Sequence, residues 1–124
     1  HPWQGAMARA VLEGVAFAIR HNLETAGLPP SPLTVIGGAA RDALQRRTLA
    51  GVLKREIAFP DASQEMTALG ALRMIAAKAG LSLAAMDAPP VLVPDTTNTE
   101  RCDSRYEAYL AASRFAREQA RLLT

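Results

Sequence analysis

The segment from residue 33 to residue 59 limits how this chain folds more than any other part of it. A short apolar run, Leu33 to Ile36, follows a proline-rich turn and predicts a buried strand. Gly37 and Gly38 come next, and apolar residues at helical spacing then lead to a second apolar run at 57–59. A helix that connects two strands favours a right-handed crossover, which makes the strands parallel. The segment therefore predicts a strand–turn–helix–strand unit.

Long helical patterns lie on both sides of this unit in the sequence. Residues 4–25 carry an apolar side chain at every fourth position, and this stripe predicts the buried face of a helix. The stripe consists of Met7, Val11, Val15, Ile19 and Leu23, with Ala8, Leu12 and Ala16 beside it. Glu13, Arg20, His21 and Glu24 are expected on the solvent side. A third helix is predicted at 66–79, with Leu69, Leu72, Ile75 and Ala76 on its apolar face. A last helix, capped by Asp103, is predicted to reach about Leu123. Residues 81–99 are expected to be irregular.

Composition excludes several other classes of protein. The chain has 124 residues, of which 49% are hydrophobic, enough for one folded domain rather than a disordered chain. The net charge is only +2, and basic residues do not cluster with aromatic ones, so we expect no nucleic-acid partner. No apolar run reaches the roughly 18 residues of a membrane span, so no membrane partner is expected. The single cysteine, Cys102, excludes an internal disulfide and fits a cytoplasmic protein.

The glycine pair between a strand and a helix suits a ligand. Glycine lets the backbone turn tightly and lets a ligand approach it without a Cβ in the way. The start of a helix offers free N–H groups and a positive dipole end, which favour phosphate. The spacing, however, matches neither the dinucleotide fingerprint nor the phosphate-binding loop of nucleotide hydrolases. By pattern alone, a tight connection without a ligand stays the alternative.

Three motifs in a fixed order add a resemblance to a known family. They are RAVLEGVAF at 9–17, GGAAR at 37–41 and, after Glu65, ALGA at 68–71. Together they resemble the carboxyl-terminal domain of the FGGY carbohydrate kinases, and most of all its xylulokinase-like branch. The resemblance covers roughly residues 8–80. These kinases phosphorylate sugars and polyols and have an actin-like, ribonuclease H-like ATPase fold.

The resemblance implies the fold class and the domain organisation. Residues 1–124 would be one partial domain of the α/β class, with short parallel strands flanked by long helices. It would be the carboxyl-terminal, nucleotide-binding part of a two-domain kinase whose amino-terminal, sugar-binding domain is absent from this sequence. A sheet of only two strands leaves its edges unpaired, so we expect upstream strands to cover one edge.

The resemblance also implies an activity and its cofactors. The intact protein would use ATP to phosphorylate a sugar or polyol hydroxyl, with Mg²⁺ held mainly by parts outside this chain. The sugar would be bound mainly by the missing domain, so no catalytic residue is predicted here. A homo-oligomer is left open.

Five residues of the glycine turn are predicted to bind the nucleotide. By resemblance, Gly37, Gly38 and Ala39 would pass close to the adenosine and phosphate groups of ATP. Asp42 occupies the position of a small polar residue that faces the nucleotide, and Arg41 occupies a basic position. The family commonly has a third glycine where Ala39 stands, and Asp42 adds negative charge near the phosphates. These departures favour the alternative function, a non-catalytic scaffold or oligomerisation module that has lost nucleotide binding.

Overall fold

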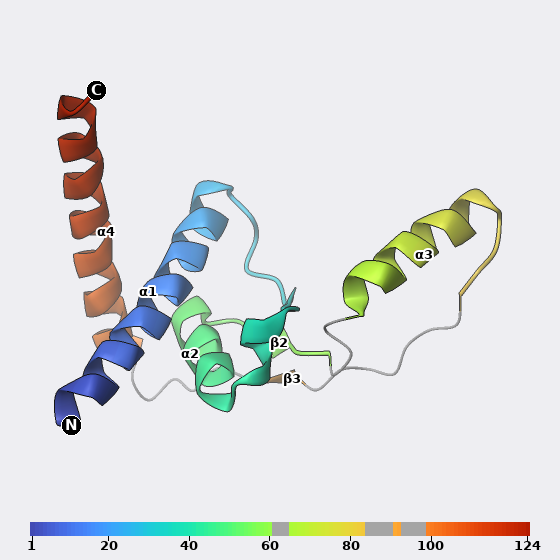
Figure 1. Cartoon of the computed structure of the whole chain (residues 1–124), viewed down its shortest axis with the longest axis horizontal. Coiled ribbons are helices and arrows are strands. Elements are labelled where there is room, and N and C mark those ends of the chain that lie inside the picture. The colour runs from blue at the N-terminus through green and yellow to red at the C-terminus, as the bar shows by residue number, and fades with distance from the viewer. Residues whose placement is uncertain (61–64, 84–90, 93–98) are drawn as a thin grey trace.

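The computed structural model describes residues 1–60, 65–83, 91–92 and 99–124, without the side chains of residues 39 and 40 (Figure 1). Its elements are α1 (Pro2–Thr25), β1 (Leu33–Thr34), the 3₁₀-helix η1 (Gly38–Arg41), α2 (Ala43–Leu53), β2 (Ile57–Ala58), α3 (Met66–Lys78), β3 (Val91–Leu92) and α4 (Thr99–Leu122). The predicted places of the strands and the four long helical segments are thus confirmed. The expected loop at 61–64 lies outside the described residues.

The described sheet is mixed and has the strand order β1-β2-β3. β1 and β2 are parallel, as predicted, with Leu33 opposite Ile57, and the Val35 N–H donates to the Ala58 carbonyl at 2.9 Å. β3 pairs antiparallel with β2. This third strand corrects two expectations, that residues 81–99 are irregular and that the sheet has only two strands. Two paired residues are too few for an alternating apolar pattern to predict a strand.

β1 is less buried than its apolar sequence predicts. Leu33 and Val35 are half-buried, whereas Thr34 and Ile36 are exposed. This alternation is typical of a strand with one covered face. β1 is also the outer strand of the described sheet, since β2 is its only partner there. The expectation of a fully buried strand is therefore wrong for these residues.

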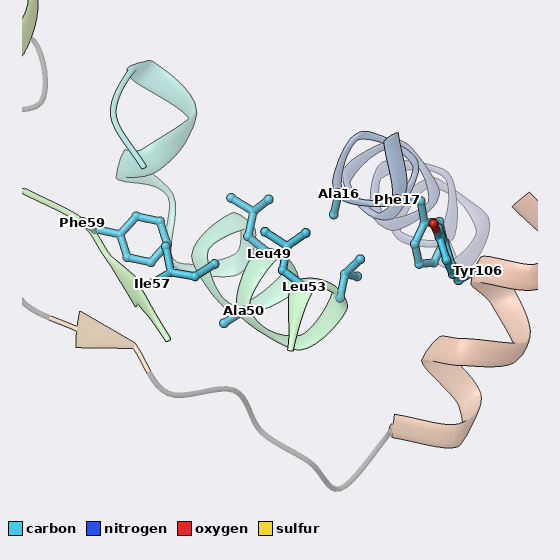
Figure 2. Packing of buried hydrophobic residues seen from close by; sticks show 9 residues of the cluster. Ala16, Phe17, Leu49, Ala50, Leu53, Ile57, Phe59 and Tyr106 are labelled. Carbon is cyan, nitrogen blue, oxygen red and sulfur yellow. The ribbon is translucent and has the colours of Figure 1, made fainter. Parts of the chain in front are cut away.

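The buried core is centred on α2. Leu49, Ala50, Val52 and Leu53 of this helix are all at most 6% exposed. Leu49, Val52 and Leu53 belong to the apolar residues at helical spacing that predict this helix, whereas Leu44, at its start, is 54% exposed. Figure 2 shows the buried side chains of α2 between Ile57 and Phe59 on one side and residues of α1 and α4 on the other. α2 therefore connects the sheet to the two longest helices.

α1 buries only one edge of the predicted apolar side. Ala16 is 0% exposed and Leu23 is half-buried, as predicted, whereas Met7, Val11 and Val15 are 60%, 66% and 46% exposed. Phe17, which lies outside the predicted stripe, is 5% exposed. The side expected to face solvent packs instead against α4. The reason is that α4 brings charged partners and aromatic rings to that side.

Ion pairs hold α4 against α1 and α2. Asp103, predicted as the cap of the last helix, lies inside α4, and its carboxylate accepts from Arg20 at 3.0 Å and from Lys54 at 2.6 Å. Arg105 pairs with Glu13 at 2.7 Å. Asp103 and Arg105 thus join α4 to α1 and to the carboxyl end of α2, and the capping role predicted for Asp103 is wrong.

Tyr106 is the buried centre of the same contact. It is 2% exposed, its hydroxyl donates to Glu24 at 2.6 Å, and its ring centroid lies 5.7 Å from that of Phe17. Burial and the hydrogen bond to Glu24 raise the pKa of Tyr106 to about 12. Burial alone would raise the pKa of Glu24, but the hydrogen bonds from Tyr106 and Arg20 outweigh it and lower that pKa. The phenol therefore stays a donor and the carboxylate an acceptor.

α3 does not flank the sheet as predicted. It makes no extensive contact with another described element and lies apart in Figure 1. Leu72 and Ile75, expected on its buried face, are 51% and 67% exposed. At Gly14 and Gly70, none of the described atoms beyond the neighbouring helix backbone lies within 4 Å of the position a Cβ would take. Within the described residues, neither glycine is needed for close packing.

We expect the Asp103 contacts to stabilise the chain only above acidic pH. Hydrogen bonds from Lys54 and Arg20 lower the pKa of Asp103. A carboxyl whose folded-state pKa is lowered contributes stability that is present above its unfolded pKa of about 4 and is lost as pH falls through the folded value. Because Asp103 is partly exposed, Asp103→Asn should lower the unfolding free energy by about 0.5–1 kcal/mol at pH 7.

Urea unfolding at pH 7 and at pH 2.5 measures this effect. The difference between the wild type and Asp103→Asn should shrink at the lower pH. Glu107→Gln, which changes an exposed carboxylate of the same helix, is the matched control and should have little effect at pH 7. An Asp103→Asn difference that is absent at pH 7, or unchanged at pH 2.5, would contradict the assignment.

Candidate functional site

The glycine turn (residues 37–42) lies at the carboxyl end of β1. Parallel pairing ends at Val35, and Gly37 then adopts φ 111° and ψ 175°. This backbone region is essentially restricted to glycine, because any side chain would clash there. Gly37 also caps η1, which begins at the next residue. The fold itself therefore requires glycine at this position, whatever the turn binds.

The turn is open on the outside. Beyond the adjacent residues, none of the described atoms lies within 4 Å of the place where a Cβ would stand on Gly37 or Gly38. Gly38 is exposed and Gly37 is half-buried. Ala39 belongs to η1 through its backbone, but its side chain lies outside the described part of the structure. The turn thus presents bare backbone to a space that a ligand can enter.

The helix after the turn begins later than predicted. η1 occupies Gly38–Arg41, and α2 starts only at Ala43. Asp42 is the N-cap of α2, and its Oδ2 accepts from the Gln45 backbone N–H at 2.9 Å. The free helix start expected directly behind Gly38 is therefore wrong. The Asp-x-x-Gln pattern of residues 42–45 is a capping signal from which this role could have been predicted.

Arg41 carries the positive charge of the turn, and its side chain is unpaired within the described residues. It is the last residue of η1, its side chain is exposed, and it makes no ion pair or hydrogen bond within the described residues. A guanidinium in this position is available to a phosphate or carboxylate group. Gly37, Gly38, Arg41 and Asp42 are thus brought together in one turn, with Asp42 already engaged by the backbone.

The glycine turn lines neither of the two cavities described among the residues of the structure. A small cavity of about 220 Å³ lies between the end of α1 and residues 53–55. A wider one of about 720 Å³ lies between α1, α2 and α4 and includes Leu44 and Arg47. None of the predicted site residues lines either cavity among the described residues. The turn could therefore form one side of a ligand site, and neither described cavity supplies the opposite side.

Other candidate groups offer little chemistry. Cys102 is half-buried, its Sγ lies 3.9 Å from the Gly51 carbonyl oxygen, and burial raises the pKa of the thiol, which disfavours a reactive thiolate. Across the described ranges, no three His, Cys, Asp or Glu residues are grouped closely enough to hold a metal ion. None of the helices described combines the length and apolarity that crossing a bilayer requires.

Comparisons with known proteins agree on one family. A model of the FGGY family of carbohydrate kinases, C-terminal domain, matches residues 2–79. The xylulose kinase of Escherichia coli (strain K12) is 30% identical over 106 residues, which cover 83% of this chain and 22% of the relative. A crystal structure described as a "xyloylose kinase" from Brucella ovis matches with a TM-score of 0.77 and 30% identity, covering 92% of this chain and 25% of that one. The chain thus spans about a quarter of these relatives.

The two glycines should differ in what a methyl group does to stability. Gly37→Ala forces a side chain into a glycine-only backbone region and should lower the unfolding free energy by about 1–3 kcal/mol. Gly38→Ala is the matched control, because its Cβ meets no atom and its backbone is 3₁₀-helical, so its effect should stay within about 0.5 kcal/mol. Urea unfolding of both variants measures the difference. Equal losses of unfolding free energy would contradict the glycine-only backbone conformation assigned to Gly37.

Proposed function

The chain belongs to the FGGY family of carbohydrate kinases, and from this premise we propose that the intact protein transfers a phosphoryl group from ATP to a sugar or polyol hydroxyl. Within it, these 124 residues form the adenosine-binding side of the cleft. The observation that carries the proposal is the open glycine turn at the carboxyl end of a parallel strand, where α/β folds bind ligands. Because two relatives are xylulose kinases, xylulose is the first substrate to test.

The residues of the turn fit a nucleotide. Gly37 and Gly38 leave their backbone bare, so the adenosine or the phosphates can approach it closely. Ala39 follows in the same turn and would lie beside the ligand. Arg41 is free to pair with a phosphate oxygen. When bound, ATP supplies the phosphoryl group, and these residues hold and orient it.

The described residues fit Mg²⁺ less well than they fit the nucleotide. Asp42 is the carboxylate of the turn, and it already accepts a hydrogen bond as the cap of α2. A further set of oxygen ligands would be needed to complete an octahedral site. We therefore propose that Mg²⁺, the general base and most sugar contacts come from parts of the kinase outside these residues. Closure of two domains would then bring the phosphate to the sugar and exclude water.

The capping role of Asp42 bears on the alternative function. A non-catalytic scaffold was favoured because the charge of Asp42 would repel phosphates and because Ala39 replaces a glycine. The cap supplies a structural reason for an aspartate at this position, and its carboxylate is directed to Gln45. Of the two departures, Ala39 remains as the feature that favours loss of nucleotide binding.

We further expect the kinase in the cytoplasm, where a lone cysteine stays reduced.

Calorimetric titration of the intact protein with Mg-ATP tests the adenosine assignment. We expect saturable binding, weakened about fivefold by Arg41→Ala through loss of a partly exposed ion pair. Gly38→Val should weaken binding about tenfold, because its side chain enters the space left for the ligand. Glu118→Gln, on the exposed far part of α4, is the control and should not change binding.

The outcome separates the two functions. Release of ADP that depends on xylulose, or on another sugar or polyol, supports the kinase. Absence of binding up to millimolar nucleotide would reject the adenosine assignment and favour the scaffold. Binding that neither variant changes would place the nucleotide elsewhere in the protein.

A further inference from the structure

One face of α1 is apolar and uncovered. We call its residues, Trp3, Met7, Val11, Val15 and Ile19, the α1 stripe. Their exposed fractions are 58%, 60%, 66%, 46% and 38% in chain order. At about 100° per residue, these five positions wind slowly around the helix and fall within roughly one half of its circumference. No other described element covers this side.

A helix with this pattern is unusual at a protein surface. The opposite side of α1 already carries the contacts with the core, through Ala16 and Phe17, and with α4. An amphipathic surface helix needs only one apolar side, whereas a helix with apolar residues on both sides belongs inside a larger protein. Contiguous exposed apolar surface of this kind marks an interaction site.

The stripe is continuous with the core. Exposure falls steadily from Val11 through Val15 to Ile19, and Leu23, the next residue in the series, is half-buried and packs against the core cluster. Residues four apart are rotated by about 40° around the helix axis, so the stripe winds from the uncovered side of α1 toward the core. The uncovered apolar side therefore borders directly on the core cluster.

We propose that the α1 stripe is an internal packing surface of the intact kinase, covered by an apolar face of the same polypeptide from outside these 124 residues. The inference rests on the proposed function in one respect, that the chain is part of a longer kinase. The relatives supply the length, since this chain covers only 22% and 25% of them. The sheet supports the same inference, because β1 is paired along only one edge in the described chain and its other edge is open to a further strand.

Cysteine labelling in the intact protein tests the proposal. Val15→Cys changes little in volume, and its reaction with a maleimide is read by mass spectrometry of the peptide that carries it, in native protein and in urea. We expect native labelling to be at least about tenfold slower than in the unfolded chain, because the site opens only by local unfolding. Ser104→Cys, at an exposed position of α4, is the control and should label at similar rates in both states.

Each outcome decides for or against the proposal. Slow native labelling of Val15→Cys that is independent of protein concentration supports it. Native labelling as fast as that of Ser104→Cys overturns it, because the stripe would then face solvent. Protection that disappears on dilution also overturns it, because the cover would then be a second copy of the protein. The labelling rate is measured without nucleotide or sugar. A protein that binds no ATP would therefore fail the calorimetric test of the proposed function without changing the labelling rate of Val15→Cys.

Discussion

The burial of α2 between the sheet and α1 is the contact on which the other contacts depend. Leu49 and Leu53 are nearly inaccessible, and each buried side chain of this size contributes about 1.5–3 kcal/mol. Ile57 and Phe59 reach the same cluster from β2 and the residue after it, so the helix fixes the sheet relative to α1 (Figure 2). The glycine turn connects β1 to this helix. Its position is therefore set by the core and does not depend on a ligand.

α4 lies beyond the residues that match the family model, yet it determines which side of α1 is covered. The family match ends at residue 79, and α4 begins at Thr99. Its contacts with α1 combine buried rings, Phe17 and Tyr106, with the ion pair of Glu13 and Arg105. Glu13 and Arg105 are 16% and 36% exposed, so the ion pair is partly shielded from water and adds to the attraction of the aromatic contact.

Local signals in the sequence predicted the elements, and distant contacts decided which sides they bury. The helix at 4–25 and the parallel strands followed from spacing and from the glycine turn, which act over a few residues. Spacing alone did not predict that the side of α1 carrying Glu13 and Arg20 is covered. The partners of these two residues lie on α4, more than 80 residues later. In the glycine turn, the conformation of Gly37 agrees with the sequence. The capping by Asp42 was missed, although Gln45 three residues later carries the signal.

The open turn and the α1 stripe have one physical explanation. A nucleotide site needs two walls to remove water from its ligand, and the described chain supplies one, with Gly37 already held at φ 111°. A helix needs cover on each apolar side, and α1 has it on one. Both deficits are met if the rest of the kinase packs on this piece. Because α2 holds the turn in place, closing the proposed site would require little reordering of the backbone here.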